Sequence, residues 1–299
     1  MTNLRVASVQ FSLRRETSLD THIAEMDRLV AQAVAGGAEV VVFPEFSSMG
    51  LLGAIDDHEV IGETVADDYR EFLAPLFPEI SEQVRQLAQR YRVTVLGGSH
   101  NRIAADGSLR NTAILAHPDG RVELQDKIHL TPPEHAMGAI GGDEMLVTKI
   151  GAFTVGVLIC ADVQFPELAR HLVARGVDLI LCPSLTWNRR GVYRVRTGCS
   201  ARAIENQCYV VMSPLVGSSG LPADAPMYAV GRSIVTTPVD KTFGLNDGVL
   251  AQAHDDSEEI IFADLDHAVL IASRERPEAP GLKLQRPELY AKLREVVNI

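Results

Sequence analysis

The chain has 299 residues, of which 46% are hydrophobic and 22% are charged, as is typical of a globular protein with a large buried core. Its 28 basic and 39 acidic residues give a formal net charge of −11, which argues against nucleic acid or a membrane surface as a partner. The start, MTNLRVASVQ, lacks the features of a signal peptide, and no window is apolar enough to span a membrane, so we expect a cytoplasmic location.

Short β-rich runs alternate with amphipathic segments along the chain, as in α/β proteins. The first part of the pattern predicts a strand at 4–10, a helix at 18–35 that begins at Ser18 or Asp20, a strand at 39–43, a helix at 79–91, and strands near 93–98, 111–116, 121–125, 145–150 and 152–159. The second part predicts a helix from Pro166 to Arg175, a strand at 177–182, a helix at 192–206, and strands near 208–213, 228–236 and 259–264. The composition shows no linker, so we expect one domain at 1–273 and a tail at 274–299 that packs on this domain or on a partner subunit.

One segment of the chain is partly repeated. AGGAEVVVFPEF at 35–46 matches ARGVDLILCPSL at 174–185 in its glycine, acidic residue, apolar run and proline. The match arises either by chance, because every α/β protein alternates helices and strands, or from a pseudo-two-fold sandwich of two sheets with helices outside. In both cases Cys160 and Glu45 come at the carboxyl ends of strands, where parallel sheets bind their ligands, so we expect them at the same rim.

The four cysteines do not form a disulfide framework or a Cys-x-x-Cys metal site, and we expect no metal or organic cofactor. Cys182, Cys199 and Cys208 are interpreted as small buried apolar residues. Cys160 differs because it lies where a strand gives way to Ala161 and a helix that begins at Pro166. Such an elbow exposes the side chain and directs backbone N–H groups that favour a thiolate and bind an oxyanion.

Two further residue types complete a hydrolytic site. Glu45 follows the apolar strand in VVVFPEF, and an apolar environment raises a carboxyl pKa into the range of a general acid and base. Lys127, in QDKIHL, would stabilise negative charge that develops on a carbonyl oxygen, and Glu134 would hold this lysine. Considered singly, Glu45 is equally compatible with a strand-end residue that reaches solvent, and Lys127 is more typical of a solvated surface lysine.

These residues lie in segments that resemble the signatures of the nitrilase superfamily of carbon–nitrogen hydrolases. The segments are FPEF at 43–46, DKIHL at 126–130, and LICAD at 158–162 with FPE at 165–167, and SARAIENQCYVV at 200–211 and GRSIVTTP at 231–238 also resemble family segments. The resemblance covers residues 4–265. It implies a four-layer α-β-β-α sandwich, a Glu45–Lys127–Cys160 triad with Glu134 beside it, an oxyanion contact from the N–H of Ala161, and a homodimer or larger homo-oligomer.

The resemblance implies hydrolysis of a small, non-peptide amide to an acid and ammonia through a thioester on Cys160. Ala161-Asp162 replaces the Trp-Glu of many nitrile-cleaving members, which favours amides. Gln164 stands where members acting on carboxylate-bearing or N-carbamoyl substrates carry arginine, so these substrates lose support unless Arg189 or Arg190 supplies the charge. Trp187 and His129 are further candidates for contact with the substrate.

Three other functions remain in competition. A papain-like enzyme would pair Cys160 with His129, but its cysteine would be expected near the start of the chain, on a helix. A catalytically inert binding or scaffold protein could have the same fold. Finally, the same thioester chemistry would serve nitrile hydrolysis, N-carbamoyl hydrolysis or amide-forming acyl transfer.

Overall fold

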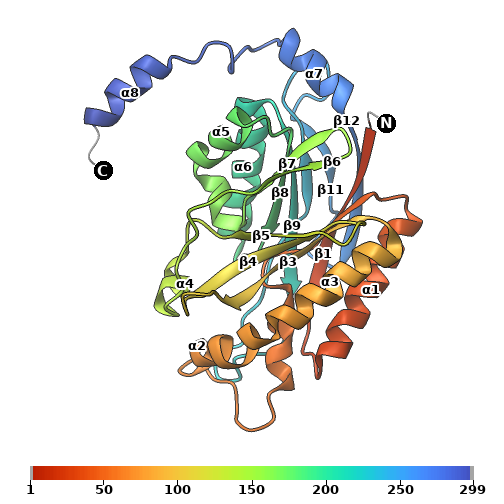
Figure 1. Cartoon of the computed structure of the whole chain (residues 1–299), viewed down its shortest axis with the longest axis vertical. Helices are drawn as coiled ribbons and strands as arrows, with labels where there is room; N and C mark the ends of the chain where they lie inside the picture. Colours follow the sequence, from red (N-terminus) through yellow and green to blue (C-terminus); the bar gives the residue numbers. More distant parts are fainter. Residues whose placement is uncertain (1–2, 297–299) are drawn as a thin grey trace.

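The strands of the computed structural model, which describes residues 3–296, form two sheets that face each other (Figure 1). In the first sheet the order is β12-β1-β2-β3-β4-β5, and in the second it is β6-β7-β8-β9-β10-β11. The first sheet contains β1 (Asn3–Leu13), β2 (Val40–Val42), β3 (Thr94–Ile103), β4 (Leu109–Ala116), β5 (Val122–Asp126) and β12 (Glu259–Asp266). The second contains β6 (Val147–Ile150), β7 (Phe153–Val157), β8 (Leu179–Ser184), β9 (Tyr209–Gly217), β10 (Ile234–Thr236) and β11 (Val249–Gln252). A short parallel pairing of β1 with β9 joins them.

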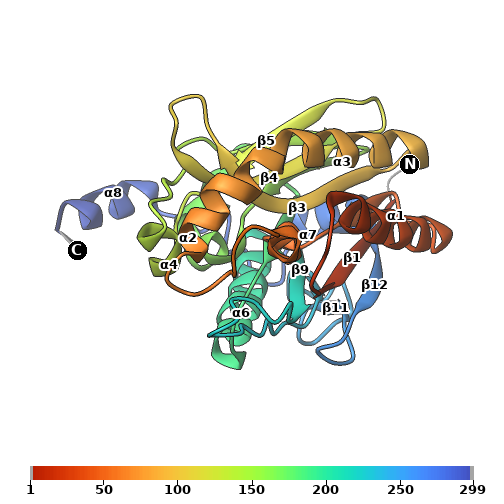
Figure 2. The same cartoon turned by 90° about the horizontal axis from the view of Figure 1, so that it is seen from below.

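Helices cover the outer face of each sheet, as the view in Figure 2 shows for α3 and α6. The first sheet carries α1 (Leu19–Ala35) and α3 (Phe77–Tyr91), and the second carries α5 (Pro166–Ala174) and α6 (Arg189–Asn206). The remaining helices are α2 (Val65–Asp68), α4 (Pro132–Ala136), α7 (His267–Glu275) and α8 (Pro287–Val296). None of the helices within residues 3–296 has the length and apolar character that crossing a membrane requires.

Alternation along the strands produces the layers. In β2, Val40 and Val42 belong to the apolar cluster that includes both sheets, whereas Val41 packs in the cluster formed with α1 and α3. Because successive strand residues point to opposite faces, one run of valines fills both the core between the sheets and the core under the helices. The result is the expected four-layer α-β-β-α arrangement.

The two sheets are related by a pseudo-two-fold repeat that extends to individual hydrogen bonds. In each half, three parallel strands are flanked by antiparallel ones: β1, β2 and β3 in the first, and β7, β8 and β9 in the second. Glu39 accepts a bond from the N–H of Arg5, and Asp178 accepts the corresponding bond from the N–H of Thr154. The sequence match between 35–46 and 174–185 therefore corresponds to equivalent structure in the two halves and is not a chance similarity.

The predicted elements agree with the structure over most of the chain. Ser18 is the N-cap of α1, and Pro166 is the first residue of α5. The prediction was wrong for two parts of the C-terminal third: β11 was not predicted, and the strand expected at 228–236 is limited to β10. The short β11 is only half-buried, so it lacks the apolar alternation that identifies a strand.

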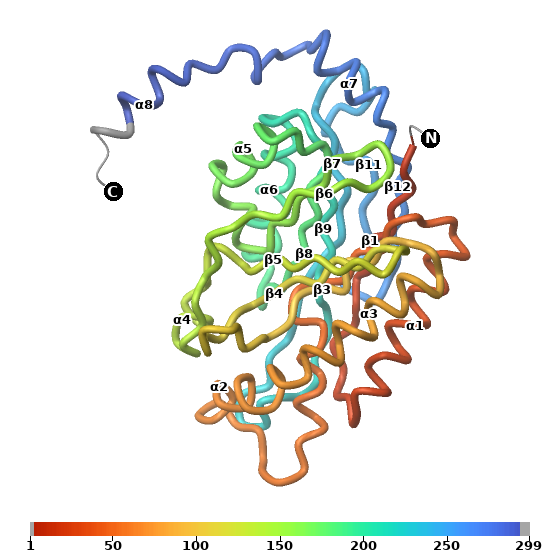
Figure 3. Tube along the Cα trace, in the orientation of Figure 1, coloured from red at the N-terminus to blue at the C-terminus, as the bar shows by residue number. Residues whose placement is uncertain are grey.

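The C-terminal tail contains α8 and the end of α7, which the sequence did not indicate. Figure 3 shows the segment after α7 running away from the two sheets. Leu284 and Tyr290 in this segment are exposed. The division into a domain at 1–273 and a tail that packs on it or on a partner subunit stays a prediction.

Candidate active site

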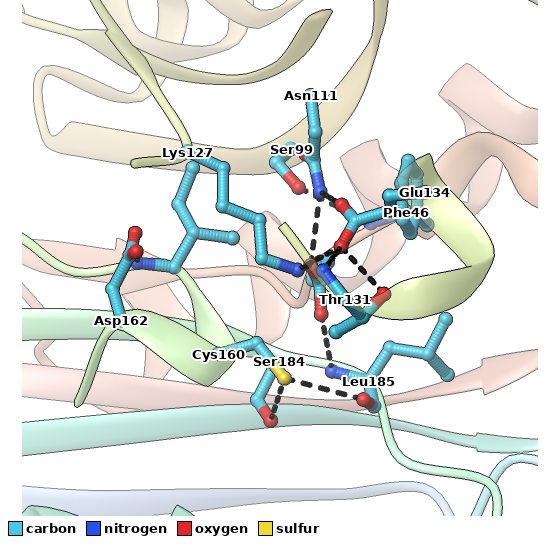
Figure 4. Close-up of polar contacts among 12 residues, drawn as sticks. Phe46, Ser99, Asn111, Lys127, Thr131, Glu134, Cys160, Asp162, Ser184 and Leu185 are labelled. Atoms are coloured by element: carbon cyan, nitrogen blue, oxygen red, sulfur yellow. Dashed lines mark hydrogen bonds and ion pairs between the residues drawn. The ribbon is translucent and has the colours of Figure 1, made fainter. Parts of the chain in front are cut away.

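Three segments that are distant in sequence meet at one rim of the two sheets, beyond the carboxyl ends of β2, β5 and β7. Glu45 follows β2, Lys127 follows β5, and Cys160 follows β7. All three side chains are almost completely buried, with 2%, 2% and 5% of their surface exposed, respectively. Figure 4 shows the ammonium of Lys127 and the thiol of Cys160 approaching the same point from opposite sides. The structure therefore brings together the residues that the sequence singled out.

Lys127 is held between two carboxylates. Its Nζ lies 2.7 Å from Oε1 of Glu45 and 2.7 Å from Oε2 of Glu134. Glu134 lies in α4, where the N–H and hydroxyl of Thr131 donate to the same Oε2 at 2.8 and 2.7 Å. This capping interaction fixes Glu134, so the position of the ammonium is determined by the fold and not by solvent.

The electrostatic environment gives the two glutamates different proton affinities. Burial raises the pKa of Glu45 above its ordinary value, and the negative charge of Glu134 adds to this effect. Burial would also raise the pKa of Glu134, but the positive charge of Lys127 and a hydrogen bond from Asn111 outweigh it and lower that pKa. Glu134 therefore stays ionised and anchors the lysine, whereas the raised pKa of Glu45 suits a group that takes up and releases a proton.

Lys127 keeps its charge despite its burial. Desolvation alone would lower the pKa of the ammonium, but the carboxylates of Glu45 and Glu134, with a contribution from the Cys160 sulfur, together outweigh this effect and the pKa is raised. A permanently charged donor at the centre of a buried site is suited to stabilising an oxyanion.

Cys160 lies at a strained elbow. Its φ is +47°, in the left-handed region that non-glycine residues rarely adopt, and it opens a 3-10 turn at Cys160–Gln164. Its Sγ is 3.3 Å from the carbonyl oxygen of Leu185 and 3.5 Å from Oγ of Ser184. Burial raises the pKa of the thiol, and the nearby Glu45 carboxylate raises it further. The thiol is therefore protonated at rest and needs a base before it can attack.

Asn111 is a site residue that the sequence analysis missed. Its Nδ2 donates to Oε1 of Glu45 at 2.9 Å and to Oε1 of Glu134 at 2.8 Å, so one amide holds both carboxylates. The backbone N–H of Leu185 donates to the other oxygen of Glu45, Oε2, at 2.9 Å. These two contacts fix the orientation of the Glu45 carboxylate.

Asp162 joins the segment that carries Lys127 to the elbow that carries Cys160. Its Oδ1 accepts from the N–H of His129 at 2.7 Å, and its Oδ2 accepts from the N–H groups of Ile128 and Ile159 at 3.3 and 3.2 Å. Because Ile128 follows Lys127 and Ile159 precedes Cys160, one buried carboxylate fixes the backbone beside both.

A cavity of about 590 Å³ opens beside these groups. Gln164, Trp187 and Ala161 line it, as expected, together with the predominantly apolar residues Phe46, Met49, Val65, Tyr69, Met137, Leu185, Val195 and Met227. His129 is the exception: it is not among the residues that line the cavity, and its ring stacks on Phe165 with centroids 3.5 Å apart. A Cys160–His129 pair is therefore absent from the arrangement around the thiol.

The two arginines that the sequence offered as a possible source of positive charge lie outside the cavity. Arg189 lies on the surface, with a guanidinium nitrogen 3.8 Å from Asp256, and Arg190 lines only a neighbouring hollow. The arginine that lines the catalytic cavity is Arg194, which the sequence analysis did not single out. Within residues 3–296, no group of three or more His, Cys, Asp or Glu side chains is arranged to hold a metal ion.

The chain is similar in sequence and in fold to known hydrolases and amidases. The family model described as carbon-nitrogen hydrolase matches residues 5–275. A probable hydrolase of Bacillus subtilis, YhcX, is 30% identical over 96% of this chain, which spans only 54% of that relative's length. A deaminated glutathione amidase of Synechocystis is 31% identical over 71% of this chain and 77% of its own. The solved structure of a nitrilase-superfamily amidase from Nesterenkonia has the same fold, with a TM-score of 0.75 at 21% identity and 97% coverage of both chains.

Proposed function

The chain belongs to the carbon-nitrogen hydrolase family, and we propose that it hydrolyses a small, non-peptide amide to an acid and ammonia or an amine through a thioester on Cys160. The observation that carries this proposal is the ion triplet of Glu45, Lys127 and Glu134 beside a buried thiol. The names of several relatives, including an omega-amidase of Saccharomyces cerevisiae that is 28% identical, support an amide as the substrate.

The first half of the reaction forms the thioester. Glu45 takes the proton of Cys160, and the sulfur attacks the carbonyl carbon of the amide. The electron pair of the C=O bond moves to oxygen, where Lys127 and the N–H of Ala161 stabilise the negative charge. When this intermediate collapses, Glu45 gives its proton to the departing nitrogen, and ammonia or an amine leaves.

The second half releases the acid. Glu45 takes a proton from a water molecule, whose oxygen attacks the thioester carbon. The C–S bond breaks, the sulfur leaves as a thiolate, and the proton on Glu45 returns to it. One amide and one water are thus converted into one acid and one ammonia or amine, and Glu45 ends as it began. A single carboxylate with a raised pKa is suited to both the basic and the acidic steps.

Ammonia release from a panel of aliphatic, aromatic and dicarboxylic monoamides, N-carbamoyl amino acids and nitriles tests the proposal. We expect an amide to be the best substrate, and Cys160→Ala to abolish its turnover. Cys208→Ala is the matched control, because Cys208 is equally buried but lies outside the cavity. Added hydroxylamine should divert part of the product to a hydroxamate, as expected of an acyl-thioester.

Each alternative predicts a different result from the same panel. If nitriles or N-carbamoyl compounds were the preferred substrates, the enzyme would still be a hydrolase, but the proposed amide substrate would be wrong. Product formed only when an amine acceptor is present would indicate acyl transfer. The absence of turnover, together with a Cys160 that does not react with iodoacetamide, would overturn the catalytic proposal in favour of a binding protein.

A further inference from the structure

The cavity beside Cys160 contains one cationic side chain that the catalytic arrangement does not use. Among the described residues that line the cavity, only Lys127 and Arg194 carry a positive charge. Lys127 is occupied by Glu45 and Glu134. Arg194, which is exposed at the mouth, makes no hydrogen bond or ion pair within residues 3–296. Its guanidinium therefore keeps all of its donors available for a ligand.

The neighbouring arginines of α6 do not share this property. Arg196 donates to the carbonyl oxygen of Arg232 at 2.7 Å and to the side chain of Gln252 at 2.8 Å, so it has a structural role. Arg189 faces Asp256, and Arg190 lies outside the catalytic cavity. Of these arginines, Arg194 is the one that combines a place in the cavity with unused donors.

Tight packing of α6 determines where Arg194 lies. A Cβ at Gly191 would be only 2.8 Å from Cβ of Thr186, and one at Gly198 would be 3.0 Å from a methyl carbon of Val163. The two glycines are seven residues apart and share one face of the helix, and Arg194 lies between them on or beside that face. Because Thr186 and Val163 follow β8 and Cys160, respectively, this close approach brings Arg194 to the edge of the site.

The remainder of the cavity gives a charged group few other partners. Its lining is mainly apolar, with Phe46, Met49 and Trp187 among the larger side chains. The whole chain carries a net charge of −11, so an anionic substrate is attracted only where a local cation is available. A guanidinium binds a carboxylate through two parallel hydrogen bonds, which fixes both its position and its orientation.

We infer that the preferred substrate carries a carboxylate at the end remote from the amide that is cleaved, and that Arg194 binds this carboxylate. This inference rests on the proposed hydrolysis at Cys160 and names the class of its substrate. Some relatives carry an arginine at the position of Gln164. In this chain, Arg194 on α6 would supply the positive charge instead. Arg194 and Gln164 line the same cavity and the same neighbouring hollow, so a charge on Arg194 lies in the same region as one at position 164 would.

The test uses matched pairs of monoamides that differ only at the remote end, where one has a carboxylate and the other a methyl ester of the same chain length. For the wild-type protein, kcat/KM should be higher for the anionic member. In Arg194→Gln, kcat/KM for the anion should fall roughly 10- to 100-fold, with most of the change in KM, since charged hydrogen bonds are lost. For the neutral member, kcat/KM for hydrolysis of the amide bond should stay within about 3-fold of the wild-type value, because the methyl ester makes no such contact.

Two further variants separate charge and geometry from folding. Arg194→Lys keeps the charge but loses the planar fork, so it should recover only part of the preference for the anion. Arg190→Gln removes an equivalent charge outside the cavity and should leave both substrates unchanged.

The failure of this inference is distinguishable from that of the proposed function. If neither member of any pair is cleaved, the hydrolase proposal fails and the subsite fails with it. If neutral amides are cleaved but the wild-type protein shows no preference for the anion, only the subsite is overturned. An equal loss for both members in Arg194→Gln would also overturn it, because that pattern indicates a structural role.

Discussion

The segments at the carboxyl ends of β2 and β8, termed the first and second loops (residues 44–46 and 183–185), occupy equivalent places in the two halves of the molecule but carry different side chains. Glu45 pairs with Ser99 in β3, and Ser184 makes the equivalent pairing with Pro214 in β9. The first loop thus presents a carboxylate where the second presents a hydroxyl. Pseudo-symmetry, which holds for the backbone and for Glu39 and Asp178, is thus lost for the side chains at these two positions.

The second loop positions the reactive groups of both halves. The N–H of Leu185 donates to Glu45, the carbonyl oxygen of Leu185 accepts from the thiol, and Ser184 contacts the same sulfur (Figure 4). In the proposed mechanism, one copy of the repeated strand and turn therefore carries the base, and the other copy holds both that base and the nucleophile. Substitutions at equivalent positions test how complete this division is.

The largest effect is expected at Glu45. Glu45→Gln keeps the shape and the contact with Leu185 but cannot take a proton, so kcat should fall by about 10²- to 10⁴-fold. Glu39→Gln changes a carboxylate at the other end of β2 that bonds only to the backbone of Arg5, and it should retain nearly full activity. Steady-state kinetics measure both variants. Activity of Glu45→Gln close to that of the wild type would exclude Glu45 as the base.

Two buried aspartates provide the next comparison. Asp162 joins the backbones beside Lys127 and Cys160, whereas Asp178 bonds to Thr154 at the opposite end of the same sheet. Replacing either with Asn places an amide against backbone donors and should lower the free energy of unfolding by about 1–3 kcal/mol. Only Asp162→Asn should also lower kcat, by roughly 10-fold or more, since it displaces the groups that react.

Thermal unfolding and kinetics together decide this second comparison. We expect both variants to have a lower Tm, but only Asp162→Asn to show slower turnover and slower alkylation of Cys160 by iodoacetamide. Equal loss of activity in the two variants, in proportion to their loss of stability, would mean that Asp162 has no specific positioning role.

The third effect is a shift in pH dependence. Glu134 raises the pKa of Glu45 through its negative charge, so Glu134→Gln should lower that pKa. Because the base must be ionised, the acidic limb of kcat/KM should then move to lower pH. The plateau should fall by about tenfold, since Lys127 loses one of its two carboxylates. A pH–rate profile measures both quantities, and movement of the limb to higher pH would contradict the assignment.

The sequence predicted best those features that depend on interactions between residues close together in the chain. Helix α1 was predicted closely because its cap at Ser18 and its apolar face are encoded within a few residues. Glu45, Lys127 and Cys160 were identifiable because each lies in a short segment at the end of a strand. The parallel arrangement of strands predicted that Glu45 and Cys160 share a rim, whereas only the family resemblance placed Lys127 with them.

Asn111 and Arg194 were missed for a different physical reason. Asn111 lies within β4 and reaches Glu45 across 66 positions of sequence, and no local pattern encodes such a contact. Arg194 lies on a helix that was predicted, but its direction depends on the close approach of Gly191 and Gly198 to other segments. Periodicity identifies the faces of a helix, whereas tertiary packing decides what each face meets.

The smallest effect is expected at Ser184, the counterpart of Glu45 in the second half. Its hydroxyl is 3.5 Å from the sulfur of Cys160, and this contact favours the thiolate. Ser184→Ala should therefore slow both alkylation of Cys160 and kcat by only about 2- to 5-fold, because hydrogen bonds to sulfur are weak. Ser213→Ala is the matched control, since Ser213 is equally buried but bonds to the backbone of Val9. A loss at Ser184 as large as that at Glu45 would mean that the second loop supplies a catalytic group of its own, and the division of labour between the halves would have to be abandoned.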